Sequence, residues 1–227
     1  KNDNEIYKLT KSSLVLIKHR GPDQTHIILT KNFCSGVNRL SIEALQYGQQ
    51  PIENNEYILG FNGEIFNYKE LIKKYNFRNP KKLSEIETIL KLWILKKENF
   101  INEINGQYAI YIYDKKKKKI YLFRDPFGIR PIYYYQNKDN FIFSSEIKAI
   151  IKTKISSFNI NEDSLAKVCM FWTNTGDETS FKKIKILEPG KYLTWSDNKT
   201  VIKRHYNFPN LNNAFKSNEN IDIYESL

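Results

Sequence analysis

The stretch Gln107–Tyr113 reads QYAIYIY, and Ile120–Phe123, shortly after it, reads IYLF. Both runs are rich in aromatic and β-branched side chains, which favour β-strands. Neither run alternates between apolar and polar side chains, so both faces of each strand are expected to be buried. A charged segment that includes Lys115–Lys119 separates the two runs and reads as a solvated turn. We therefore predict two antiparallel strands in a sheet that is covered on both sides.

Working outward from this pair, the apolar pattern predicts further strands and helices on both sides. Ser84 followed by Glu87 has the spacing of a capping box at the start of a helix. Strands are predicted at 26–29, 33–37, 57–61, 64–66, 132–135, 141–144, 192–195 and 200–203, and helices at 6–18, 68–74, 84–96, 146–152 and 162–170. This order favours an α+β protein in which stacked antiparallel sheets carry helices on the outside.

The composition excludes several classes of protein. The 227 residues are 41% apolar, and no run approaches the roughly 20 apolar residues of a membrane span. The start, Lys1 to Glu5, is polar and shows no signal peptide, so a cytoplasmic location without a membrane partner is expected. The net charge of +11 comes mainly from scattered lysines, which favours a solvated basic surface over a nucleic-acid site. Two distant cysteines, Cys34 and Cys169, suggest neither a disulfide framework nor a metal site.

The sequence Phe61-Asn62-Gly63-Glu64 is the strongest local feature with chemical potential. Asn-Gly is the common pair of a tight hairpin turn, because both residues tolerate positive φ. The same pair could also aim an amide side chain and a backbone N–H at one point and so stabilise an oxyanion. Both interpretations stay open on local sequence alone.

Other candidate residues have plain structural alternatives. Arg39, at the end of a predicted strand, could hold a carboxylate through two parallel hydrogen bonds. Glu85 and Glu87 could simply favour the start of a helix. The segment Asp125–Pro131 (DPFGIRP) could be an ordinary connection between strands. Each cysteine is most simply a small apolar residue.

The order of the motifs carries more information than any one of them. They are HRGPD at 19–23, NRLSI at 38–42, QP at 50–51, FNGEIFNY at 61–68, SEIE at 84–87, NGQYA at 105–109, RDPFGIRP at 124–131 and SSEIKA at 144–149. This series resembles the class II glutamine amidotransferase domain of the asparagine synthetase family, over residues 14–206. Amidophosphoribosyltransferases share the RDPFGIRP type of loop but not usually HRGPD or SSEIKA.

The resemblance implies an αββα sandwich of the N-terminal nucleophile hydrolases and hydrolysis of glutamine by an N-terminal cysteine. It implies that Asn62 and Gly63 form the oxyanion hole and that Arg39 grips the α-carboxylate of glutamine. The other implied binding residues are Leu40, Ser41, Ile42, Glu43, Glu64 and Glu85. Glu85 stands where the family usually has Asp, which puts its contact with the α-amino group in doubt.

The resemblance also implies a longer protein. A domain at 1–206 is expected to precede a linker and the start of a synthetase domain at 207–227. No cofactor is expected in the first domain, whereas ATP and Mg²⁺ are expected in the synthetase domain. The family begins with a Cys-Gly-Ile-x-Gly strand, but this chain opens at the approach to its first helix. The three explanations are an N-terminus that is disordered or lies outside this sequence, a deliberate or natural truncation, and a family member that has lost its glutaminase activity.

The alternatives to an asparagine synthetase are a non-catalytic domain that supports a synthetase and an amidotransferase that acts on another carboxylate. A homodimer is also left open.

Overall fold

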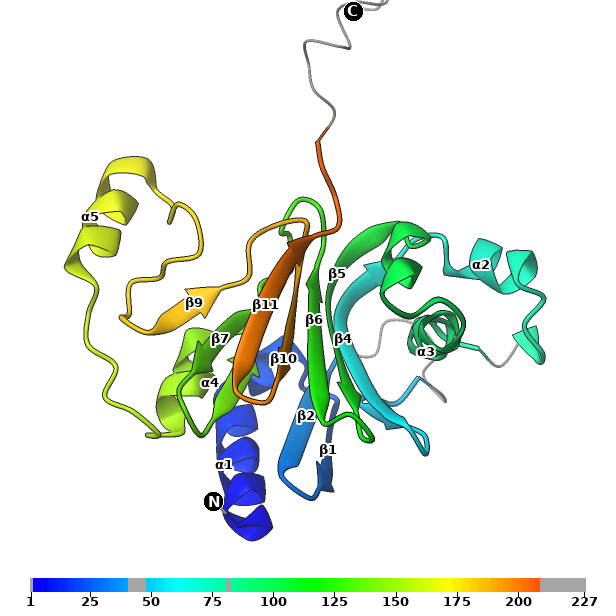
Figure 1. Ribbon diagram of the computed structural model, residues 1–227, viewed down its shortest axis with the longest axis horizontal. Coiled ribbons are helices and arrows are strands. Elements are labelled where there is room, and N and C mark those ends of the chain that lie inside the picture. Colours follow the sequence, from blue (N-terminus) through cyan, green and yellow to red (C-terminus); the bar gives the residue numbers. More distant parts are fainter. Residues whose placement is uncertain (1, 41–47, 81–82, 209–227) are drawn as a thin grey trace, which may run out of the picture.

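The structure is a computed structural model that describes residues 2–40, 48–80 and 83–208 (Figure 1). Five α-helices appear in these ranges: α1 (Asp3–Leu16), α2 (Tyr68–Lys74), α3 (Glu85–Lys96), α4 (Ile147–Lys152) and α5 (Glu162–Phe171). The strands are β1 (Gln24–Thr30), β2 (Phe33–Arg39), β3 (Ile52–Glu53), β4 (Tyr57–Ile65), β5 (Gly106–Asp114), β6 (Lys119–Arg124), β7 (Tyr133–Gln136), β8 (Phe141–Ser144), β9 (Ile184–Ile186), β10 (Lys191–Ser196) and β11 (Lys199–Arg204).

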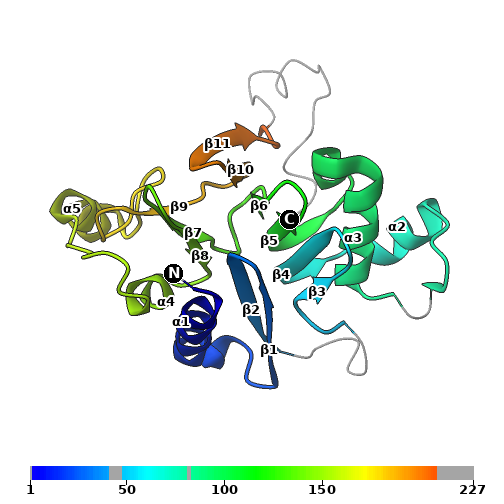
Figure 2. The ribbon, with the colours of Figure 1, turned by 60° about the horizontal axis from the view of Figure 1, so that its bottom comes forward.

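The strands form three antiparallel sheets. The largest has the order β11-β10-β6-β5-β4-β3, so the two predicted apolar strands lie at its centre. A hairpin of β1 and β2 and a sheet of order β8-β7-β9 make up the other two. Figure 2 shows that these two smaller sheets lie in one layer against the large sheet. Helices α2 and α3 cover the far face of the large sheet, and α1 and α4 cover the smaller sheets. The α+β class and the stacked antiparallel sheets are confirmed.

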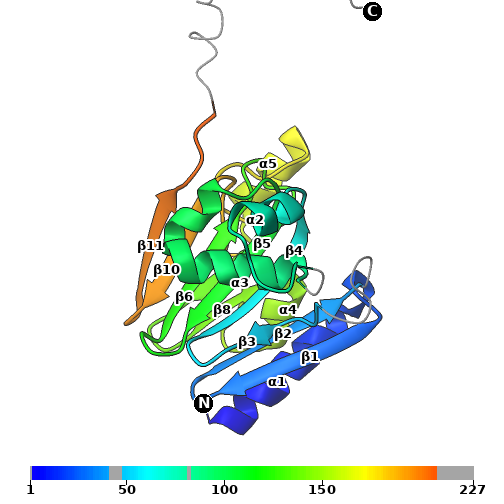
Figure 3. The ribbon, with the colours of Figure 1, turned by 90° about the vertical axis from the view of Figure 1, so that its right-hand side faces the viewer.

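Two cores explain why the central strands are apolar on both faces. One lies between the large sheet and α3, where Trp93 and Phe123 are almost completely buried. The other lies between the sheets, where Ile58 and Leu122 are fully buried. Burial of a large apolar side chain contributes about 1.5–3 kcal/mol, so covering both faces of these strands contributes much of the stability. Figure 3 looks onto the α3 side of this arrangement.

The capping box at the start of α3 is confirmed. Ser84 is the N-cap, and its backbone N–H donates to Glu87 Oε2 at 2.8 Å. The helix then places Ile86, Ile89 and Trp93 against the large sheet.

The prediction of two strands around a turn at Asn62-Gly63 is wrong. Strand β4 runs without interruption through both residues, and Asn62 pairs with Ala109 while Gly63 pairs with Tyr108 on β5. The long neighbouring strand supplies partners for every residue of β4, and this pairing outweighs the local turn preference.

Smaller differences occur at the ends of elements. Helix α1 begins at Asp3 instead of residue 6, because the side chain of Asn2 accepts a hydrogen bond from the backbone N–H of Glu5. It ends at Leu16, and Lys18–Arg20 form a 3-10 turn. The short strands β3 and β9 were not predicted, since two or three residues carry too little periodicity. The predicted linker after residue 206 lies almost wholly outside the described residues.

Candidate functional site

The side-chain amide of Asn62 is the most informative polar group of the large sheet. It lies on β4, and its Nδ2 atom is buried with no hydrogen-bond partner among the described residues. A buried N–H group without an acceptor costs about 1–3 kcal/mol. Such a group is retained most readily where a ligand supplies the acceptor, so Asn62 is the centre of the candidate site.

Gly63 places a backbone N–H beside this amide. The N–H of Phe61 donates to Gln50 Oε1 at 2.9 Å, and the N–H of Ile65 donates to Glu85 Oε1 at 2.6 Å. Neither acceptor belongs to β5. Because alternate amides of a strand point to the same side, the N–H of Gly63 also points away from β5, between these two bonds. The amide of Asn62 and this N–H are therefore two neighbouring donors on one strand, a pair that could stabilise an oxyanion.

Only glycine fits at position 63. Its φ is +147°, and a Cβ atom built there would lie 1.9 Å from the carbonyl oxygen of Gln107. The close approach of β4 and β5 thus depends on the absence of a side chain.

Arg39 lies at the end of β2 and is only 8% exposed. The fold brings its guanidinium close to the start of α3, with Gly48 between them. A Cβ atom built on Gly48 would lie 3.3 Å from Arg39 Nη2 and 3.2 Å from Ser84 Oγ. Arg39 and the start of α3, where Glu85 follows Ser84, thus lie on either side of Gly48. The charges of Arg39 and Glu85 match the carboxylate and ammonium groups of an α-amino acid.

Glu85 has a structural contact as well as a candidate role. As the first residue of α3, it accepts the hydrogen bond from Ile65 and so fixes the end of β4, two residues after Gly63. The longer Glu side chain thus reaches the strand that carries the candidate donors.

Of the remaining predicted binding residues, the structure describes two. Leu40 and Glu64 are exposed next to Arg39 and Gly63. Ser41, Ile42 and Glu43 lie outside the described residues. Gln50 had no predicted role, but its side-chain oxygen accepts the hydrogen bond from the backbone N–H of Phe61. Nothing in the sequence around Gly48 predicted its place beside Arg39. These contacts depend on the fold, since the acceptors of the β4 amides come from the segment before β3 and from the first residue of α3.

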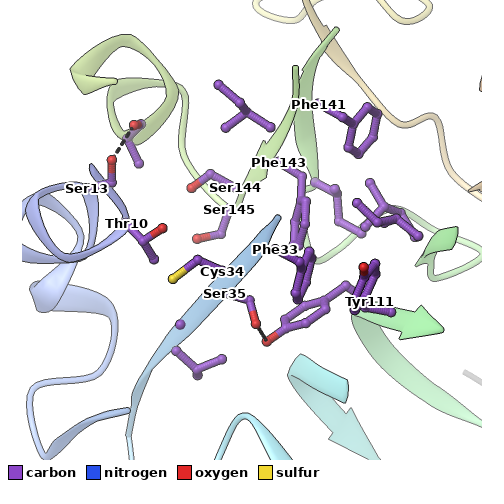
Figure 4. A pocket seen from close by; sticks show the side chains of 18 of the residues that line it. Thr10, Ser13, Phe33, Cys34, Ser35, Tyr111, Phe141, Phe143, Ser144 and Ser145 are labelled. Atoms are coloured by element: carbon purple, nitrogen blue, oxygen red, sulfur yellow. Dashed lines mark hydrogen bonds between the residues drawn. The ribbon is translucent and has the colours of Figure 1, made fainter. Parts of the chain in front are cut away.

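A cavity of about 830 Å³ adjoins Arg39, Asn62 and Gly63. It is lined by the side of β2 and by β8. In the described parts of the chain, β2 pairs with β1 alone and β8 with β7 alone, so each contributes a free sheet edge. Figure 4 shows Phe33, Ser35 and Phe143 around this space. Its walls also include the inner face of the large sheet and helix α1.

The two cysteines do not complete the site. Cys34 lies five residues before Arg39 on β2, which corresponds to roughly 17 Å along a strand. Burial raises the pKa of its thiol, although a hydrogen bond with Thr10 acts in the opposite direction. Figure 4 shows its sulfur on the side of β2 that faces Thr10. Cys169 is exposed on α5.

Two further features of the molecule bear on its class. Within the described ranges, no three His, Cys, Asp or Glu side chains gather as a metal site requires. The helices of the same ranges include none that is long and apolar enough to span a membrane.

The chain is similar to known proteins over nearly all of its described length. Residues 1–207 match the family model described as a glutamine amidotransferase domain. A putative asparagine synthetase [glutamine-hydrolyzing] 2 of Methanocaldococcus jannaschii is 32% identical over 89% of this chain and 43% of its own length. The asparagine synthetase [glutamine-hydrolyzing] 2 of Bacillus subtilis is 34% identical over 82% of this chain and 26% of its own length. The chain thus spans less than half of these relatives.

Solved structures support the fold. The glutamine phosphoribosylpyrophosphate amidotransferase from Bacillus subtilis, complexed with ADP and GMP, superposes with a TM-score of 0.60. The two sequences are 19% identical, and the match covers 88% of this chain and 46% of the amidotransferase chain. At this identity, the likeness extends to the arrangement of the sheets and helices only.

Proposed function

The chain belongs to the glutamine amidotransferase domain family, and from this premise we propose that it hydrolyses glutamine for a longer asparagine synthetase. The single observation that carries the proposal is the buried Nδ2 atom of Asn62, which lacks an acceptor among the described residues and adjoins the outward N–H of Gly63. These donors would hold the amide oxygen of glutamine as negative charge develops on it.

The substrate fits the charges around the donors. Arg39 would hold the α-carboxylate of glutamine through parallel hydrogen bonds, and Glu85 would attract its α-ammonium group. Leu40, Ser41, Ile42, Glu43 and Glu64 would complete the binding pocket. The side-chain amide would then extend toward Asn62 and Gly63.

We place the nucleophile on an additional strand that lies in the cavity between β2 and β8. A cysteine thiolate at the end of that strand would attack the amide carbon of glutamine. The amide C–N bond would break as the nitrogen takes up a proton and leaves as ammonia, and a thioester would remain on the cysteine. Water would then hydrolyse the thioester, which releases glutamate and restores the thiol. Neither Cys34 nor Cys169 suits this task, because Cys34 is half-buried and lies five residues along β2 from Arg39, and Cys169 is exposed on α5.

The ammonia would serve a second part of the same polypeptide. The relatives named as glutamine-hydrolysing asparagine synthetases are more than twice as long as the part that this chain matches. We propose a synthetase half that uses ATP and Mg²⁺ to activate aspartate, with no cofactor in the present domain.

Arg39→Lys in the full-length protein tests the substrate contact. We expect the KM for glutamine to rise about 10–100-fold, because lysine cannot form two parallel hydrogen bonds with a carboxylate. The kcat is expected to change little, since the contact is the same in the ground and transition states. Steady-state release of glutamate measures both constants.

Arg204→Lys is the matched control, because Arg204 is exposed on β11. It is expected to leave both constants unchanged. An unaltered KM in Arg39→Lys would show that Arg39 does not bind the substrate, and a parent protein that releases no glutamate would favour the non-catalytic alternative.

A further inference from the structure

The loop between β6 and β7 is held rigidly by one buried carboxylate. Asp125 is completely buried, and its side chain accepts hydrogen bonds of 3.0 Å from the backbone amides of Phe127, Ile129 and Arg130. A carboxylate that receives three backbone amides fixes the path of the chain around it. The loop is therefore a preorganised structure.

Arg124 secures the same loop from the other side. Its guanidinium donates to the carbonyl oxygens of Gly128 at 2.6 Å, Arg130 at 3.1 Å and Leu187 at 2.5 Å. Gly128 has a φ of +67°, and a Cβ atom there would lie 2.7 Å from the ring of Pro189. Two buried charged residues and a sterically required glycine thus hold one conformation.

This rigid loop presents apolar side chains to solvent. Phe127 is 68% exposed and Ile129 is 57% exposed. The ring of Phe127 packs against Phe208, with 5.4 Å between ring centroids, and Phe208 packs in turn against Tyr206. We call Phe127, Ile129, Tyr206 and Phe208 the Phe127 surface.

The Phe127 surface lies where the described chain leaves the domain. The backbone amides of His205 and Tyr206 donate to the carbonyl oxygen of Gly190, and His205 Nε2 donates to the carbonyl oxygen of Arg124 at 2.8 Å. These bonds tie the segment after β11 to the start of the loop, as Figure 1 shows at the upper end of β6 and β11. Phe208, the last described residue, therefore lies beside Phe127.

We propose that the Phe127 surface is the docking site for the synthetase half of the same polypeptide. The inference rests on the proposed function, which assigns such a half to the longer chain. An exposed apolar group on a rigid loop is typical of a surface that a partner covers. A half that belongs to the same polypeptide and follows Phe208 in sequence would be held at a high effective concentration near the surface, which favours it over a second copy of the chain.

The test uses the full-length protein and the double variant Phe127→Ser and Ile129→Ser. We expect protease cleavage between the two halves to be about tenfold faster in the variant, because loss of central apolar anchors typically weakens an interface by that factor or more. Glutamate release in the absence of other substrates is expected to stay at the parental rate. If the double variant misfolds by circular dichroism, Phe127→Ala replaces it.

Trp172→Ser is the matched control, because Trp172 is 94% exposed at the end of α5 and lies outside the Phe127 surface. It is expected to leave cleavage unchanged. Equal cleavage of the parent and the Phe127 variant, or faster cleavage of the Trp172 variant alone, would overturn the proposal. A change of oligomeric state in the Phe127 variant, without faster cleavage, would assign the surface to a second copy and also overturn it. Absence of glutaminase activity in the parent would refute the proposed function, while the cleavage rates would still decide the docking site.

Discussion

Replacing Asn62 by alanine is expected to lower the kcat for glutamine hydrolysis about 100–1000-fold, which is typical of the loss of one oxyanion-hole donor. The stability of the domain is expected to change little. The Nδ2 atom of Asn62 has no acceptor among the described residues, so its removal breaks no hydrogen bond there and relieves a buried polar group. Glutamate release and urea denaturation measure the two effects separately.

Asn67→Ala is the matched control, because this asparagine has structural partners. Its side chain donates to the carbonyl oxygen of Glu103 and accepts from the amide of Asn105, both at 2.9 Å. Its loss is expected to lower the free energy of unfolding by about 1–2 kcal/mol and to leave the kcat near the parental value. An Asn62→Ala protein with full activity would remove this residue from the oxyanion hole.

Replacing Gly63 by alanine is expected to lower the free energy of unfolding by about 3 kcal/mol or more. The φ of +147° disfavours any side chain, and the new methyl group would overlap the carbonyl oxygen of Gln107. Since β4 and β5 both contribute buried side chains to the two cores, the strand cannot move aside without disturbing the packing on both faces. Urea denaturation of the variant checks the size of the effect.

Gly176→Ala separates backbone strain from overlap. Gly176 has a φ of +72°, but a Cβ atom there would meet nothing within 4 Å. Only the backbone preference is lost, so the expected cost is about 1–2 kcal/mol. If Gly63→Ala and Gly176→Ala lowered the free energy of unfolding by the same amount, close packing of β4 against β5 would not be the reason for glycine at position 63.

Much of the fold could be predicted from the sequence because its signals were local. The QYAIYIY and IYLF runs predicted the centre of the large sheet, and Ser84 with Glu87 predicted the start of α3. The error at Asn62-Gly63 has a clear cause. Local preference favoured a turn, but pairing along the whole of β5 made β4 continuous.

The candidate site was only partly predictable, because several of its contacts join segments that are distant in sequence. The donor group of Asn62 and Gly63 followed from the chemistry of the residues and their family resemblance. The contacts of Gln50 with Phe61 and of Glu85 with Ile65 depend on how separate segments meet, and no periodicity in the sequence reports them. The cavity beside β2 and β8 likewise results from the arrangement of whole sheets.

Covalent labelling of the full-length protein with an electrophilic glutamine analogue tests the central claim most directly. We predict a single adduct, located by peptide mass spectrometry, on a cysteine other than Cys34 and Cys169. Excess glutamine should prevent the adduct, and Arg39→Lys should slow its formation. An adduct on Cys34 or Cys169, or no adduct in a protein that hydrolyses glutamine, would contradict the proposed site.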